Sequence, residues 1–435
     1  MFVGTAINLT ADLLSSAFPV ALFAGGEIGV WYDPSDITTL FQDNLGATPV
    51  TAPAQTVGLI LDKSGRGNNA TQATSTQRPT YGINPITGTR NLLTYSQDFS
   101  QSIWAVAGAA TKTASASVCP DGTTSAYTIS VGTGSNFFWY NSLNITAAAR
   151  YEPSVYIKRV TTTGTLRINS SNGTANGQWT INLALLGSGF ERITRSHPAV
   201  TVVTEFTGTG NNFSGITFVS VAGTLQFEVW GAQIELGTTS TAYQKVVTQY
   251  EVTEAGVQSV SYLRFDGVDD GMVTGTITPA IDKVQIFVGL RKLSDAAQKI
   301  VAELSATIAS NAGSFALTAP NSAAANYNFS SKGTTQTDNV VTTYTSPITS
   351  VISGLGDIAG ASNLIRVNGT QVGSTLTTQG TGNYLAYPLY LGRRGGTTLP
   401  FNGRIYSMIV RFGSNMTAGQ IASTESWVNS KTGAY

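Results

Sequence analysis

In this 435-residue chain, the carboxylates are the side chains most suited to catalysing a hydrolysis. Cleavage of a glycosidic bond uses two carboxylates that face one cleft, about 5–10 Å apart. Glu228 and Glu235 fall in one predicted strand, residues 227–237, and an odd number of positions separates them. Because side chains alternate between the faces of a regular strand, we expect these two to face opposite sides of the sheet. The sequence therefore predicts no catalytic residue and no enzyme.

Three aspartates, Asp266, Asp269 and Asp270, lie in one short stretch. Carboxylate oxygens are hard ligands that suit calcium. The Asp-Gly and Asp-Asp-Gly steps of the same stretch also favour a tight turn without any metal. We expect turn geometry to point the three carboxylates in different directions. Calcium at these aspartates and a metal-free turn both stay open, and no other cofactor is expected.

The chain has one histidine, His197, and one cysteine, Cys119. A zinc site needs several histidine or cysteine ligands, and nucleophilic catalysis needs a nucleophile held beside a base. We expect His197 to be a surface turn residue without burial or a charged partner, and Cys119 to be a small buried hydrophobe. These two residues predict neither a metal centre nor a catalytic triad.

Aromatic side chains offer one further kind of chemistry, the recognition of glycans. Aromatic rings can cover the apolar C–H faces of sugars, while amides and hydroxyls bond to the sugar hydroxyls. Trp139 and Tyr140 belong to an aromatic run, residues 137–140, whose members alternate between the two faces of a strand. Together with Trp104 they are the candidate glycan-binding residues. Packing in a core explains each of these rings as well.

Composition excludes several classes of function. Lys+Arg and Asp+Glu both number 24, so no net field would attract nucleic acid. Charged residues make up only 11% of the chain, against roughly a quarter in ordinary globular proteins. This is typical of β-rich surface proteins of cells or viruses. The apolar run at residues 17–24 is too short to span a bilayer, and the N-terminus lacks the basic residues of a secretion signal, so neither membrane insertion nor general export is expected.

The stretch that carries the three aspartates has the pattern of a strand that ends in a turn. Leu263 and Phe265 alternate with Arg264 and Asp266, the period of a half-buried strand. Residues 263–271 resemble the "FDG-x-DD" strand of concanavalin-like (laminin-G-like) jelly rolls. In that family this strand usually follows closely on a segment that residues 61–81 match here. Because too many residues separate the two segments for a loop, we infer that a folded domain is inserted between them.

The inserted segment resembles a second family, the carbohydrate-binding-module-like jelly rolls of phage appendages. Residues 91–99 match the opening "NLL-x-YS-x-DF" of that family, and residues 227–243 match its closing strand. We therefore expect an arm at residues 1–26, a discontinuous concanavalin-like sandwich at 27–90 plus 248–435, and an inserted jelly roll at 91–247. A T-x-x-Q capping box at Thr417 predicts a short C-terminal helix. The fold class is all-β with two antiparallel β-sandwiches.

Residues 31–72 resemble a segment that recurs in virion proteins of tailed bacteriophages. The resemblance implies a structural protein of the virion surface, as a tail fibre, head fibre, spike or capsid decoration that attaches to host-surface glycans. The expected partners are other virion proteins, contacted through the N-terminal arm, and further copies of the chain, most plausibly in a trimer. The alternatives are a polysaccharide-degrading tail enzyme and a purely architectural capsid decoration. Packing of the arm on its own first domain also stays open.

Overall fold

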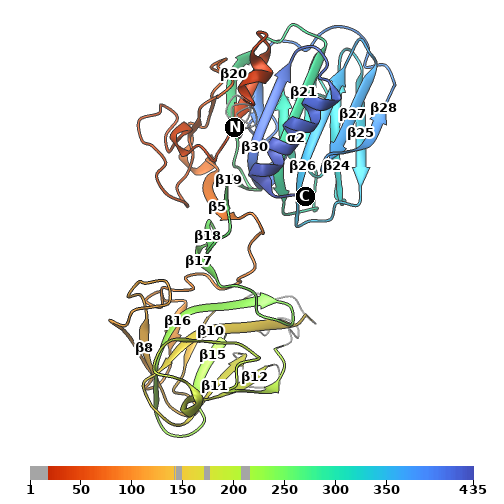
Figure 1. Cartoon of the computed structure of the whole chain (residues 1–435). Coiled ribbons are helices and arrows are strands. Elements are labelled where there is room, and N and C mark those ends of the chain that lie inside the picture. Colours follow the sequence, from red (N-terminus) through yellow and green to blue (C-terminus); the bar gives the residue numbers. More distant parts are fainter. Residues whose placement is uncertain (1–17, 142, 144–148, 171–176, 207–215) are drawn as a thin grey trace, which may run out of the picture. The chain divides into compact units, whose positions relative to one another are not determined.

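The structure, a computed structural model, describes residues 18–141, 143, 149–170, 177–206 and 216–435. The chain forms two compact units (Figure 1). Unit 1 combines residues up to 86 with residues 260–435, and unit 2 consists of residues 87–259. A segment with its own core thus interrupts unit 1 between β5 (Thr80–Pro85) and β19 (Ser259–Asp266).

The observed unit 2 begins four residues before the expected range of 91–247 and ends twelve residues after it. The extension on the C-terminal side is a hairpin of β17 (Gln244–Thr248) and β18 (Glu251–Glu254). Glu254 of this hairpin accepts hydrogen bonds from Arg90 and Gln244, at 2.7 and 2.9 Å. Arg90 and Glu254 lie near the two ends of the inserted segment, so these contacts hold its two ends together.

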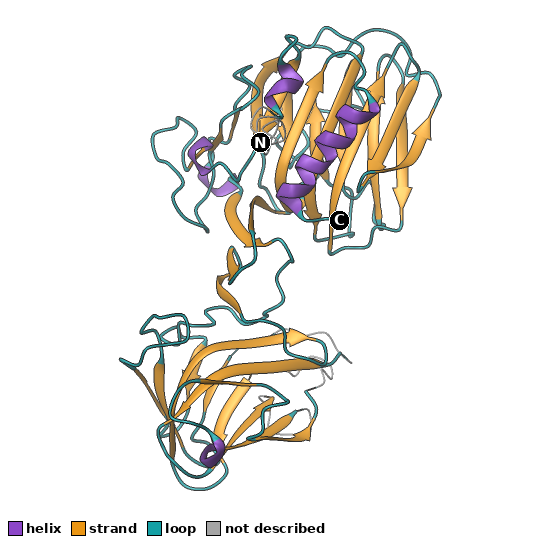
Figure 2. Ribbon diagram, in the orientation of Figure 1, coloured by secondary structure: helices purple, strands orange, loops and turns teal. Residues whose placement is uncertain are grey.

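Unit 1 is a sandwich of two antiparallel sheets (Figure 2). In the first sheet the order is β5-β19-β30-β21-β26-β27-β28, and β1 also pairs with β30. Besides β5 and β19, its strands are β1 (Ile28–Tyr32), β21 (Lys283–Lys292), β26 (Ile348–Asp357), β27 (Ser362–Val367), β28 (Thr370–Thr375) and β30 (Asn402–Phe412).

The second sheet of unit 1 has the order β2-β3-β4-β20-β29-β22-β23-β24-β25. Its strands are β2 (Leu40–Phe41), β3 (Leu59–Ile60), β4 (Ala70–Thr71), β20 (Met272–Ile277), β22 (Ile300–Leu304), β23 (Ser314–Thr318), β24 (Asn326–Lys332), β25 (Gln336–Thr342) and β29 (Tyr387–Leu391). Alternate residues of both sheets, such as Ile286 of β21 and Phe315 of β23, form the core between them.

Helical structure is confined to short pieces in the described part of the chain. Helix α2 (Ala418–Thr432) packs on β21, β26 and β30 (Figure 2). The predicted capping box is present, since the Thr417 side chain accepts from the Gln420 N–H and the Gln420 side chain accepts from the Thr417 N–H. The remaining helices are single 3-10 turns: η1 (Val20–Phe23), η2 (Ile37–Thr39), η3 (Ser75–Gln77) and η4 (Leu183–Leu185).

The expected N-terminal arm is described only from residue 18 onward, and residues 1–17 lie outside the described part. Leu22 and Phe23 are buried against Trp31 and Val428 of unit 1. The carbonyl of Leu22 accepts a hydrogen bond from Arg411. Residues 18–23 therefore pack on their own domain, the alternative that the sequence left open.

Unit 2 is the smaller sandwich. One sheet has the order β13-β10-β16-β8-β7, and its strands are β7 (Thr111–Ala114), β8 (Tyr127–Val131), β10 (Tyr151–Arg159), β13 (Glu191–Ile193) and β16 (Leu225–Leu236). The other has the order β14-β12-β11-β15-β9-β6, with β6 (Trp104–Val106), β9 (Phe138–Tyr140), β11 (Thr165–Ser170), β12 (Gln178–Asn182), β14 (Val200–Thr204) and β15 (Ile216–Ser220).

The predicted all-β class, with two antiparallel sandwiches and a short C-terminal helix, is confirmed. Among the described residues, no helix has the length and apolar character needed to cross a membrane.

Candidate functional site

The three aromatic residues predicted to bind a glycan do not share one surface. Trp104 and Tyr140 are 0% and 2% exposed, and both belong to the core of unit 2. Their rings pack edge to face, 4.9 Å apart, and the indole N–H of Trp104 donates to the carbonyl of Tyr95. A sugar cannot reach a ring that the core covers, so the glycan-binding assignment is corrected for these two. Trp139, which points to the other face of β9, is half-buried.

A different aromatic cluster lies on the outer face of the five-stranded sheet of unit 2. Tyr156 of β10 and Trp230 of β16 pack with Tyr243, which follows β16 in the chain. The ring centroids of Trp230 lie 5.0 Å from Tyr156 and 5.2 Å from Tyr243. We call these three residues the outer aromatic cluster. The hallmark strand and its Thr-Ala-Tyr extension already contained Trp230 and Tyr243, but nothing in the sequence indicated that they meet.

A β-bulge in β16 makes this arrangement. Opposite β10, the register shifts between Ser154 and Tyr156, so that β16 carries one extra residue at Gly231. Gly231 has φ +56°, and a Cβ at this position would lie 3.1 Å from Tyr156 and 3.3 Å from Tyr243. Glycine satisfies both the left-handed backbone and the close approach of the two rings.

Because of the bulge, the prediction that the two glutamates of this strand face opposite sides of the sheet is wrong. Before the bulge Phe227 and Val229 face the core, and after it Ala232 and Ile234 do. Glu228 and Glu235 therefore lie on the same face of the sheet, because the extra residue inverts the alternation. Along the strand they are still roughly 20 Å apart at 3.3 Å per residue, well beyond the reach of a glycosidase pair.

Each of these glutamates already has protein partners. Glu228 pairs with Lys158 at 2.9 Å and accepts from the Ser115 hydroxyl at 2.7 Å. Burial raises the pKa of Glu228, but the bonds from Lys158 and Ser115 outweigh it and hold the pKa below its ordinary value. Glu235 accepts from the N–H and the hydroxyl of Thr241, both at 2.7 Å.

Two neighbouring cavities open on unit 2 beside the outer aromatic cluster. The larger, about 460 Å³, is lined by the three rings of the cluster and by Asp121 and Glu254 among other residues. The second, about 400 Å³, is lined by the rings of Tyr95 and Tyr127 and by Asp98. Gln97 and Lys245 line both cavities, so the two are adjacent, and we call them together the groove.

The groove combines partly exposed rings with polar groups. Tyr95, Tyr127, Tyr156 and Tyr243 are all half-buried, whereas Trp230 is buried. Within the described part of the chain, the Lys245 ammonium forms no ion pair. Cavities of this size with aromatic walls and a few polar groups are typical of small-ligand sites.

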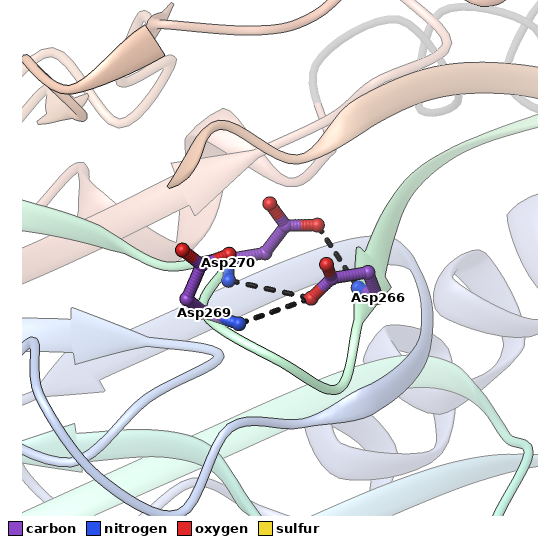
Figure 3. Close-up of side chains that lie close together, drawn as sticks. All are labelled: Asp266, Asp269 and Asp270. Atoms are coloured by element: carbon purple, nitrogen blue, oxygen red, sulfur yellow. Dashed lines mark hydrogen bonds between the residues drawn. The ribbon is translucent and has the colours of Figure 1, made fainter. Parts of the chain in front are cut away.

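The three aspartates at the end of β19 converge instead of diverging (Figure 3). One oxygen from each carboxylate lies within 4.8 Å of the others. The prediction of divergent directions was wrong because one oxygen of Asp266 accepts from the N–H groups of Val268, Asp269 and Asp270 and so draws the turn around itself. Asp270 in return accepts from the Asp266 N–H at 2.9 Å.

The carboxylates of Asp266 and Asp270 thus stabilise the turn by accepting its backbone N–H groups. Burial, together with the charge of Asp266, raises the pKa of Asp270 to about 7. The oxygens that make no bond within the turn are hard donors that fit calcium chemically. Calcium at these three aspartates stays a prediction.

His197 differs from its expected environment. Its Nε2 lies 3.1 Å from a carboxylate oxygen of Glu191, and its Nδ1 accepts from the Ala199 N–H at 3.1 Å. The accepting Nδ1 places the proton of the neutral ring on Nε2, toward Glu191. The side chain is 15% exposed, so it has both the burial and the charged partner that the sequence did not reveal. Cys119 is buried as expected.

Comparison with known proteins gives distant structural likenesses. No protein-family model and no curated protein matches the chain. The binding domain of botulinum neurotoxin serotype D is similar with a TM-score of 0.32 and 11% identity, over 38% of this chain and 42% of that chain. The CBM40 domain of the Ruminococcus gnavus IT-sialidase is similar with a TM-score of 0.28 and 17% identity, over 34% and 84%.

The chain therefore spans less than half of the length of the botulinum chain that it matches. TM-scores of this size assign neither a ligand nor an activity to the chain.

Proposed function

We propose that this chain is a non-enzymatic structural protein of a tailed-phage virion surface, and that its unit 2 binds a host-surface glycan. The observation that carries the binding function is the groove on unit 2, in which Tyr156 and Tyr243 line one cavity and Tyr95 and Tyr127 the other. Half-buried tyrosines present both a ring face for sugar C–H groups and a hydroxyl for hydrogen bonding.

Polar groups in the groove supply the second half of sugar recognition. Gln97 and Lys245 lie where the two cavities meet. An amide can both donate to and accept from sugar hydroxyls, and an ammonium can donate to them. The groove therefore suits a ligand of about two sugar units that spans the two cavities, one unit in each.

The virion role is supported by the sequence motifs. Residues 31–72 resemble a segment of phage virion proteins, and the low charge of 11% suits an assembled surface protein. In this proposal the chain forms a homo-oligomer, most plausibly a trimer. Leu22 and Phe23 are buried in unit 1 and are not free to contact another protein. In this proposal residues 1–17 of the arm therefore attach the chain to the virion.

A binding measurement tests the glycan proposal. The purified full chain is applied to an array of bacterial surface glycans and then titrated with a positive glycan by calorimetry. Replacing Lys245 or Tyr156 with alanine should weaken binding, because each change removes a group from the groove. Lys299→Ala, a change of the same kind in unit 1, should leave binding unchanged. Equal binding by Lys245→Ala, Tyr156→Ala and the unchanged protein would contradict the site.

Two further measurements separate the alternatives. Incubation with host capsule or lipopolysaccharide should release no reducing sugar. A release that disappears in Glu228→Gln, Glu235→Gln or Asp270→Asn would establish an enzyme instead. Antibody labelling of intact virions should place the chain on the tail or the head, and virions without labelling would refute the virion role.

A further inference from the structure

A second site on unit 2 centres on Glu152, at the start of β10. Glu152 lies directly opposite Glu235 in the ladder between β10 and β16. Both side chains are on the outer face of the sheet, since their neighbours Tyr151 and Ile234 belong to the core. The two residues are only 1% and 2% exposed. Two carboxylates are thus buried side by side, an arrangement that is unfavourable when both are charged.

The two carboxylates differ in how they are satisfied. Glu235 accepts from the Thr241 N–H, the Thr241 hydroxyl and the Gln233 amide. Among the described residues, no group donates a hydrogen bond to either oxygen of Glu152. The backbone N–H of Arg195 acts to lower the pKa of Glu152, but it does not meet hydrogen-bond geometry. A buried carboxylate without a partner is costly, and proteins usually pair such a group or bind a metal with it.

A small cavity borders this carboxylate. Its volume is about 150 Å³, which leaves room for an ion and several waters. Besides Glu152, hydroxyl residues of two turns line it: Thr194, Ser196, Thr238, Thr239 and Ser240. The Ser240 hydroxyl is itself buried and, within the described part of the chain, has no partner. Oxygen atoms of two separate turns therefore surround the unpartnered carboxylate.

The charged groups around the cavity form no ion pair with Glu152 among the described residues. Arg195 also lines the cavity, but its guanidinium binds Glu205, with one contact at 2.6 Å. Arg150 pairs with the same Glu205 at 2.9 Å. Burial first, and then the charges of Glu205 and Glu235, raise the pKa of Glu152 to about 7.

We propose that this cavity is a binding site for a divalent cation of the calcium type, with Glu152 as its anchoring carboxylate. Hydroxyl and carbonyl oxygens of residues 194–196 and 238–240, together with water, would complete the coordination. The donor set consists of oxygen atoms, which favours calcium over zinc or copper. The site is separate from the glycan groove and does not depend on the proposed function.

Calcium titration of the full chain tests the proposal. After treatment with EDTA, added CaCl₂ should bind in calorimetry and raise the melting temperature. Glu152→Gln keeps the shape of the side chain but removes its charge, and it should abolish this binding. Ser240→Ala, a milder change, should weaken it about tenfold, the loss typical of a supporting partner.

Two controls keep the result specific. Glu228→Gln removes a paired carboxylate from the same sheet face, and Asp269→Asn alters the aspartate turn of unit 1; both should leave the binding to unit 2 unchanged. The proposal is overturned if, in the Asp269→Asn background, calcium binding persists when Glu152 is also changed to Gln. It is equally overturned if the unchanged protein binds no calcium; a higher melting temperature of Glu152→Gln would then identify Glu152 as a buried acid without a metal.

Discussion

The ring of Tyr243 lies 5.2 Å from that of Trp230, centroid to centroid, on the outer face of the five-stranded sheet of unit 2. The hydroxyl of Tyr243 in turn lies 2.7 Å from the hydroxyl of Ser96, near the start of the same unit. The segment that leaves β16 is thereby held over the sheet, and it forms one wall of the groove. The proposed glycan site and the closure of unit 2 therefore depend on the same contacts.

The bulge residue beneath these rings should be sensitive to substitution. Gly231→Ala adds a Cβ at φ +56° and also crowds Tyr156 and Tyr243. A left-handed alanine alone costs about 1–2 kcal/mol, and the crowding should add to it. Gly223→Ala is the matched control, because Gly223 has φ +66° and open space around it. Urea unfolding should show a larger loss of stability for Gly231→Ala; equal losses would mean that the rings move aside freely.

Truncation of Trp104 should destabilise unit 2 more than truncation of Trp139. Trp104 is enclosed by the core, so Trp104→Ala should cost about 3–5 kcal/mol in the free energy of unfolding. Trp139 is half-buried on the other face of β9, and Trp139→Ala should cost clearly less. Glycan binding that is lost in a folded Trp139→Ala variant would move the site to that face of unit 2.

Glu228 should make unit 2 less stable in acid. Its pKa in the folded state is lowered by Lys158 and Ser115, so ionised Glu228 stabilises the fold above its unfolded pKa of about 4.3. This stabilisation is lost as the pH falls through the lower folded pKa. The difference in unfolding free energy between the unchanged protein and Glu228→Gln should therefore be full at about pH 7 and shrink below about pH 4. A difference that stays constant over this range would show that the ion pair contributes nothing.

The N-terminal cap of α2 should contribute to the stability of unit 1, and two substitutions of Thr417 test this. Thr417→Ala removes the hydroxyl that accepts from the Gln420 N–H and should cost about 1 kcal/mol. Thr417→Ser keeps that hydroxyl and should be close to neutral. Chemical unfolding of unit 1 measures both variants, and equal stability of the two would mean that the cap does not contribute.

Local patterns in the sequence were sufficient to predict individual strands and the C-terminal helix. The alternation around Leu263 and Phe265 identified β19, and the Thr417 capping box identified the start of α2. Both signals work because they act between residues close in the chain, through strand period and backbone capping. The separation of two segments that resemble one jelly-roll family likewise indicated an inserted domain.

Tertiary structure alone decided which residues meet at the sites. The sequence of the aromatic run around Trp139 does not show which face of the strand is the core face. Only the closure of the two sheets buried Tyr140 and left Trp139 half-buried. The bulge at Gly231 inverted the alternation of β16, which no count of positions could foresee. Glu152 and Glu235 are far apart in the chain and became neighbours through strand pairing. Long-range register and the burial that follows from it are properties of the folded chain, and they determine both the groove and the Glu152 cavity.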